Sequence, residues 1–211
     1  EYLGKVKEKT VALMLLRIKK DLEKLNIHQD IFVSELDLVN KGKIDDAIEQ
    51  LKSQDLIYQG VLNQPKGKNI DDWEPREQML FKSSLFGDEV DRPLMKSNGE
   101  WTYFANDIAY HFDKYKRGSQ HLIDILGADH GGYIKRMEAA VQALTSNKAS
   151  FTAKLCQMVK LIKGGKQLKM SKRSGDFITL DEMINEVGSD SIRFMMMYRK
   201  NEAPLEFDFD K

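Results

Sequence analysis

Apolar residues spaced three and four apart predict an amphipathic helix over residues 11–25, where lysines occupy the positions between them. The same periodicity predicts further helices over residues 44–51, 106–116, 133–144, 180–186 and 190–198. Short apolar runs predict strands at residues 31–33, 56–62, 79–82, 101–104, 121–126 and 155–162. The proline-rich, polar stretch over residues 63–76 predicts a long loop.

The second half of the chain has the order strand, glycine turn, helix, strand. The predicted strand over residues 121–126 ends at Gly127, and a helix separates it from the next predicted strand. This order indicates a βαβ unit, and therefore an α/β fold with a parallel sheet. Ligands of such sheets bind at the carboxyl ends of the strands, where Gly127 and the Gly164-Gly165 pair lie.

Composition narrows the class of protein. The 211 residues carry no net charge, and Cys156 is the single cysteine, which excludes an internal disulfide framework and a cysteine-based metal site. The longest apolar run, residues 11–16, is far too short to span a membrane. We therefore expect a globular protein of a reducing, cytoplasmic setting, without a membrane partner and without a metal site of its own.

Charge is distributed unevenly along this neutral chain. Between Glu138 and Asp176 there is no acidic residue. The cations in that interval are Lys148, Lys154, Lys160, Lys163, Lys166, Lys169, Lys172 and Arg173. Two interpretations remain open, a solvated basic face and a surface that faces phosphates.

The segment from Lys169 to Gly175, with the sequence KMSKRSG, carries the most specific chemistry. Two lysines three residues apart, with the Ser171 hydroxyl between them, can close on a polyphosphate. Attack on the α-phosphorus of ATP expels pyrophosphate, and fixed cations stabilise the charge of that leaving group. A basic surface loop without a ligand is the competing interpretation.

This segment resembles the second signature of class I aminoacyl-tRNA synthetases, which usually has serine at the position of Arg173. The resemblance implies that Lys169, Met170, Ser171 and Lys172 bind ATP, with Lys169 and Lys172 as catalytic residues. It also implies that Mg²⁺ accompanies the ATP.

Two further segments narrow the resemblance to the arginyl-tRNA synthetase family. They are TYFANDIAYH at residues 102–111 and GADHGGY at residues 127–133; the residues 205–210 also match the start of that family's helical domain. The resemblance implies that Tyr103 and Asp107 contact the substrate arginine. A guanidinium group needs a carboxylate that accepts paired hydrogen bonds and an aromatic ring for stacking, and these two residues supply them.

Gly127, Asp129 and His130 follow the end of a predicted strand, where a carboxylate can accept hydrogen bonds from ribose. The resemblance implies that they bind ATP, and that His130 also contacts arginine. The division of these roles between Asp129 and His130 stays open, and His111 is either structural or part of the site.

The resemblance implies three regions. Residues 1–100 would hold the end of the first half of a Rossmann-like nucleotide fold and a connective insertion; residues 101–180 its second half; and residues 181–211 the start of an α-helical anticodon-binding domain. The family's His-Ile-Gly-His element is absent from the sequence. We therefore expect a piece of a longer, monomeric protein, and we expect the piece alone to be inactive.

The implied activity is the ATP-dependent ligation of arginine to tRNA through arginyl-adenylate, a step of protein biosynthesis. Two rivals are a different class I synthetase and a non-catalytic nucleic-acid-binding module that uses the basic stretch. A structural domain without a ligand is the third, and the ordered motifs speak against it.

Overall fold

The computed structural model describes residues 2–62, 76–168 and 177–210. The chain divides into two compact units, of which the first comprises Glu1–Phe32 with Cys156–Lys211 and the second comprises Val33–Leu155. Each unit has a hydrophobic cluster of its own. These boundaries differ from the predicted ones at residues 100 and 180, and the division into family domains stays a prediction.

The second unit begins with helices α2 (Glu35–Asn40) and α3 (Lys43–Ser53) and continues into strand β1 (Ile57–Gly60). Strands β2 (Gln78–Phe81) and β3 (Arg92–Pro93) complete an antiparallel sheet of order β1-β2-β3, with Tyr58 opposite Leu80 and Leu80 opposite Pro93. A short 3-10 helix, η1 (Ser83–Phe86), connects β2 to the following turn.

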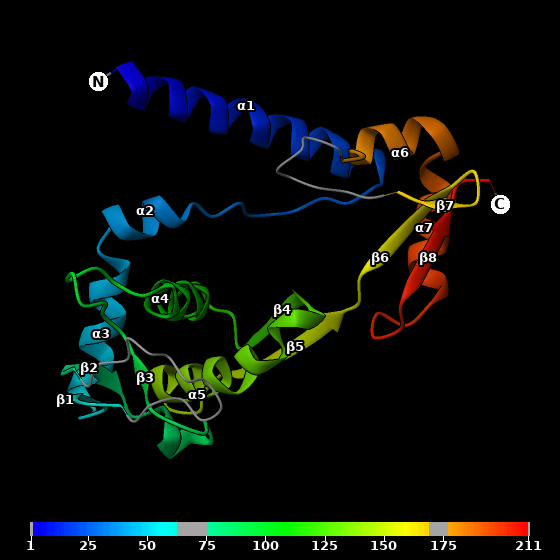
Figure 1. Ribbon diagram of the computed structural model, residues 1–211. Coiled ribbons are helices and arrows are strands. Elements are labelled where there is room, and N and C mark those ends of the chain that lie inside the picture. Colours follow the sequence, from blue (N-terminus) through cyan, green and yellow to red (C-terminus); the bar gives the residue numbers. More distant parts are fainter. Residues whose placement is uncertain (1, 63–75, 169–176, 211) are drawn as a thin grey trace. The chain divides into compact units, whose positions relative to one another are not determined.

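Helices α4 (Tyr103–Lys116) and α5 (Ile134–Thr145) supply most of the remaining core of this unit. Between them run strand β4 (His121–Gly127) and the 3-10 helix η2 (Ala128–Tyr133), and β5 (Ser150–Cys156) pairs with β4 (Figure 1). The two strands start side by side, because the Ser150 amide donates to the Gln120 carbonyl. The apolar faces of α3, α4 and α5 meet in one cluster, which explains why their periodicity is strong.

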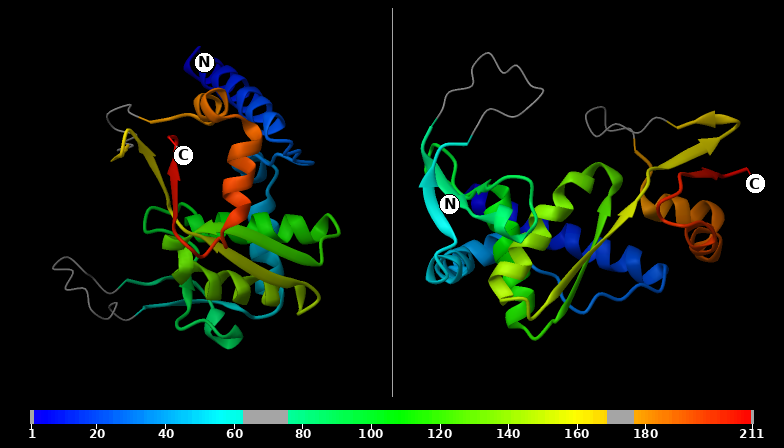
Figure 2. Two further views of the ribbon diagram at one scale, coloured as in Figure 1. Left: turned by 90° about the vertical axis from the view of Figure 1, so that its right-hand side faces the viewer. Right: turned by 90° about the horizontal axis from the view of Figure 1, so that it is seen from below.

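The first unit holds helix α1 (Tyr2–Lys24) and, from the other end of the chain, β6 (Val159–Lys163), β7 (Lys166–Gln167) and β8 (Leu205–Asp208). Strand β6 pairs antiparallel with β7 and parallel with β8, the yellow and red strands of Figure 2. Helices α6 (Leu180–Val187) and α7 (Ser189–Tyr198) follow each other directly, joined at Gly188. Residues 205–208, which the resemblance assigns to a helical domain, form strand β8.

The α/β class and the helices at α3, α5, α6 and α7 are confirmed, whereas three strand predictions are wrong. Residues 155–162 are not one strand: the chain leaves β5 at Gln157, whose amide donates to the Asn201 carbonyl, and re-enters a different sheet as β6. Residues 101–104 contain the start of α4, which the Thr102 hydroxyl caps, so Asn106 is not the cap. Residues 31–33 form no strand, and Ile31 is exposed.

The described strands thus form three small sheets, rather than one continuous parallel sheet. Among the described helices, none has the length and apolar character that a membrane crossing requires.

Candidate functional site

The predicted arginine contacts lie at the start of α4. Tyr103 is its first residue and Asp107 lies one turn later, so the two side chains share a helix face. Tyr103 is 81% exposed, and the Lys96 ammonium lies over its ring, 5.6 Å from the centroid. Asp107 is half-buried. The Tyr103 ring, which lies in the predicted strand over residues 101–104, is therefore a solvent-facing ring on a helix with a cation over its face.

Tyr133, the last residue of η2, donates a hydrogen bond from its hydroxyl to Oδ2 of Asp107. Burial, followed by the hydrogen bond to the Asp107 carboxylate, raises the pKa of the Tyr133 phenol well above its usual range. The phenol therefore stays protonated and remains a donor to the carboxylate. Tyr133 lies in the segment at residues 127–133 on which the resemblance rests. Nothing in the sequence pairs it with Asp107, 26 positions earlier.

The predicted nucleotide contacts lie at the other end of η2. Gly127 ends β4, and Asp129 and His130 follow in the 3-10 helix with side chains that are 83% and 56% exposed. Nε2 of His130 lies 3.7 Å from Oδ2 of Asp129. A Cβ atom at position 127 would lie 2.6 Å from Oδ1 of Asp129, so glycine makes room for this carboxylate. One short helix therefore connects the two groups of predicted contacts.

His111 has a supporting position. It is 4% exposed, with Nδ1 2.7 Å from the Asp107 carbonyl oxygen and Nε2 2.8 Å from Oδ2 of Asp124. Burial by itself would raise the pKa of Asp124, but the hydrogen bond from His111 and that from Lys114 lower it to about 2. His111 therefore ties α4, at the turn that carries Asp107, to strand β4.

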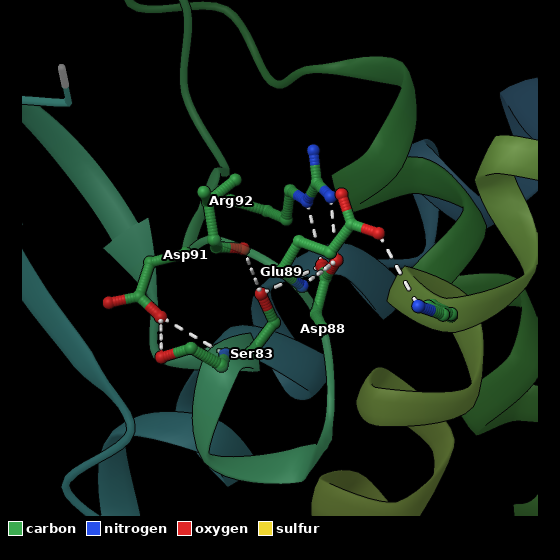
Figure 3. Close-up of polar contacts among 8 residues, drawn as sticks. Ser83, Asp88, Glu89, Asp91 and Arg92 are labelled. Atoms are coloured by element: carbon green, nitrogen blue, oxygen red, sulfur yellow. Dashed lines mark hydrogen bonds and ion pairs between the residues drawn. The ribbon is translucent and has the colours of Figure 1, made fainter. Parts of the chain in front are cut away.

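A second polar cluster surrounds η1 (Figure 3). Arg92 donates from Nε and Nη2 to the two oxygens of the buried Asp88, each at 2.6 Å, and Ser83 donates to Asp88 over 3.0 Å. Burial would raise the pKa of Asp88, yet the bonds from Arg92 and the Glu89 amide lower it. This cluster joins β3 to η1, and neither Asp88 nor Arg92 was singled out from the sequence.

Two buried polar atoms in the described part of the chain have no hydrogen-bond partner, Oδ1 of Asn106 and Nε of Arg136. Arg136 lies on α5 with its guanidinium 5.4 Å from the centre of the Tyr133 ring. Burial and the neighbouring Arg92 lower the pKa of Arg136.

Lys169, Met170, Ser171 and Lys172 lie outside the residues that the structure describes. Of the basic stretch, Lys160 pairs with Glu206 and Lys163 with Glu186, both in the first unit. Within the described ranges, no group of three His, Cys, Asp or Glu side chains is placed to hold a metal ion.

Known proteins with similar sequences are arginine–tRNA ligases. The chain is 54% identical to the arginine–tRNA ligase from Ruegeria pomeroyi, in an alignment of 210 residues that covers 100% of this chain. It is 58% identical to the one from Roseobacter denitrificans, in an alignment of 202 residues that covers 96% of this chain. It spans 36% and 35% of the length of those relatives. No protein-family model matches the chain.

Comparison with solved structures leads to the same family. An arginyl-tRNA synthetase from Campylobacter jejuni matches 94% of this chain with a TM-score of 0.76 and 36% identity, over 40% of its own length. A methionyl-tRNA synthetase from Mycobacterium tuberculosis matches with a TM-score of 0.60 at 11% identity, which shows a shared fold alone. More than half of the aligned positions are identical between this chain and two arginine–tRNA ligases. The chain therefore belongs to the arginyl-tRNA synthetase family.

Proposed function

We propose that the protein that contains this chain ligates arginine to tRNA in two steps. Arginine and ATP would first give arginyl-adenylate and pyrophosphate, and the arginyl group would then pass to the terminal ribose of tRNA. The observation that carries the proposal is the pairing of a half-buried carboxylate, Asp107, with an exposed ring, Tyr103, one helical turn apart. These are the two groups that bind a guanidinium.

In this proposal Asp107 accepts hydrogen bonds from the guanidinium and the Tyr103 ring stacks on it. The Lys96 ammonium, 5.6 Å from the centroid of that ring, supports this role, because an aromatic face is a favourable place for a cation. Selectivity would come from Asp107, since a neutral or shorter side chain leaves the carboxylate unpaired and that costs binding free energy.

Asp129 and His130 would contact the adenosine of ATP, and His130 would also face the substrate arginine. Both side chains are exposed at the end of β4, which supports access to a ligand. Lys169 and Lys172, with Met170 and Ser171, would hold the phosphates and stabilise the departing pyrophosphate. Mg²⁺ would come with the phosphates of ATP, whose oxygens are its preferred ligands.

We further propose that β4, α5 and β5 belong to the second half of a Rossmann-like nucleotide fold, in a cytoplasmic and monomeric protein. The 211-residue chain by itself is expected to be inactive, because its sequence holds no His-Ile-Gly-His element. Measurable arginine-dependent pyrophosphate exchange by the chain alone would contradict this.

The test is tRNA charging and pyrophosphate exchange by the protein at its natural length, with Asp107→Asn as the variant. The loss of a charged acceptor should lower kcat/KM for arginine by about 30-fold or more, since a truncated hydrogen-bonded charge pair costs about 2–5 kcal/mol. Asp113→Asn is the matched control, because Asp113 lies on the same helix and pairs with Lys43 and Arg117. It should keep nearly the wild-type rate.

If the wild-type protein binds tRNA but charges nothing, the nucleic-acid-binding module replaces this proposal. If it charges tRNA with another amino acid, the arginine assignment falls while the class stands.

A further inference from the structure

The Asp107 carboxylate has two oxygens, and the protein already engages one of them. The Tyr133 hydroxyl donates to Oδ2, and no described residue donates a hydrogen bond to Oδ1. We infer that Tyr133 is a positioning residue of the arginine subsite: its hydroxyl fixes the plane of the Asp107 carboxylate and leaves Oδ1, with the second lone pair of Oδ2, to accept from the guanidinium. The inference rests on the proposed function.

A carboxylate on a helix needs such a partner because its last torsion is soft. The terminal torsion of aspartate joins sp³ and sp² carbons, and its distribution is broad. A hydrogen bond to an ionised acceptor is about twice as strong as one between neutral groups, so a single donor can select one orientation. Tyr133 is placed to act in this way on Asp107.

The Tyr133 ring is itself held from two sides, which makes it the fixed member of the pair. Phe104 meets it edge-on, with centroids 6.3 Å apart and planes at 89°, and the Arg136 guanidinium covers it at 5.4 Å. The ring also packs against the core cluster of the second unit. Moving it would break these contacts, so the carboxylate adapts to the phenol.

The direction of the hydrogen bond is also fixed. The pKa of the Tyr133 phenol is raised by burial and then by Asp107, so the hydroxyl keeps its proton at the pH values at which such enzymes are assayed. The phenol therefore acts only as a donor to Asp107. A guanidinium also carries only donors, so it can pair with Oδ1 and with the second lone pair of Oδ2 in the carboxylate plane that Tyr133 fixes.

Tyr133→Phe tests the inference, because it removes the hydroxyl and keeps the ring contacts with Phe104 and Arg136. In the protein at its natural length, KM for arginine should rise about tenfold or more, as expected for a lost hydrogen bond to a charged group. KM for ATP and kcat should stay within about twofold of wild type. Equilibrium dialysis with labelled arginine should give a parallel loss of affinity.

Tyr115→Phe is the matched control, since Tyr115 lies on α4 with its ring stacked on Phe112, 6.4 Å between centroids. It removes one phenol from the same unit and should leave KM for arginine unchanged. Tryptophan fluorescence checks that both variants are folded.

Three results would overturn the inference. An unchanged KM for arginine in Tyr133→Phe would show that the hydroxyl does not position Asp107. A lowered KM would show that Tyr133 competes with the substrate for the carboxylate. A parallel loss of kcat, of ATP affinity and of thermal stability would show a structural role only.

These results stay separate from the proposed function. Wild-type charging of tRNA with arginine, together with an unaffected Tyr133→Phe variant, removes this inference alone. A wild-type protein that uses no arginine removes both.

Discussion

The two compact units bury their apolar residues to very different extents. In the second unit the cluster around α3, α4 and α5 contains Leu51, Ile108 and Met137, all without measurable exposure. Among the described residues of the first unit, the cluster has five buried members, including Ile192 and Phe207, and α1 contributes none. The predicted arginine and nucleotide contacts of the described residues all belong to the better-packed unit.

The packing of the second unit can hold still the side chains that are predicted there as arginine and nucleotide contacts. Asp107 gains its orientation from Tyr133, whose ring packs against the core cluster, and the buried His111 supports the turn beneath it. Local devices of the first unit include the capping box at the start of α6 and the glycine turn between β6 and β7. Tryptophan fluorescence can follow the unfolding of the second unit alone, because both tryptophans of the sequence, Trp73 and Trp101, fall within Val33–Leu155.

The largest expected effect is that of Phe81→Ala. Phe81 is fully buried in β2 and stacks on Phe86, so its removal should lower the free energy of unfolding of the second unit by about 3–5 kcal/mol. Urea unfolding followed by tryptophan fluorescence measures this unit. Phe194→Ala in the first unit, where Phe194 is 65% exposed, is the control and should shift the fluorescence midpoint little. Equal effects of the two variants would remove the contrast.

Lowering the pH is expected to have an intermediate effect on the stability of the second unit. The pKa of Asp124 is about 2 in the fold against 3.8 for the free side chain, so its stabilisation is present above about pH 4 and is lost as the pH falls towards 2. This contribution is about 2 kcal/mol. In Asp124→Asn the stability of the second unit should fall less steeply over that pH range, as measured by urea titrations at each pH.

The control for acid is Asp113→Asn, which removes a carboxylate of α4 that pairs with Lys43 and Arg117. A slope that changes equally in both variants would mean that total charge, rather than the His111–Asp124–Lys114 contacts, causes the pH dependence.

The smallest effect concerns the first unit. Thr179 caps α6 in a capping box with Glu182, so Thr179→Ala should cost about 1 kcal/mol. Hydrogen exchange of peptides from α6 should speed up, while tryptophan fluorescence of the second unit stays constant. Thr179→Ser keeps the hydroxyl and should restore slow exchange; if it does not, the cap is not the cause.

Helices could be predicted from apolar periodicity, including α1, which buries none of its residues. The errors concern short apolar runs, whether exposed as at residues 31–33 or buried as at Phe104. Helices α3 and α5 have strong apolar periodicity because they pack in the core. The apolar residues 31–33 resembled a buried strand, yet Ile31 and Val33 are exposed. The interruption of the predicted strand at Gln157 could not be predicted from the sequence, because the Gln157 amide bonds to the carbonyl of Asn201, 44 positions away.

For the candidate site, the sequence predicts Tyr103, Asp107, Asp129 and His130 as contacts, but it does not predict which residues these side chains meet in the fold. In the sequence, Tyr133 is the last residue of the glycine-rich segment at residues 127–133. Only the fold brings its hydroxyl to Asp107. The same holds for Asp124, which meets His111 across two elements. The assigned roles in ATP and arginine binding stay predictions.

The close approach of Gly127 to Asp129 has a consequence for how the protein can change by mutation. With a Cβ at position 127 only 2.6 Å from Oδ1 of Asp129, the exposed end of the Asp129 side chain would have to rotate away. Such a substitution would alter the orientation of the carboxylate that is proposed to meet the nucleotide, while the fold stays intact. The effects of substitutions at the two positions are therefore expected to be non-additive: a change at position 127 matters most while position 129 carries a carboxylate.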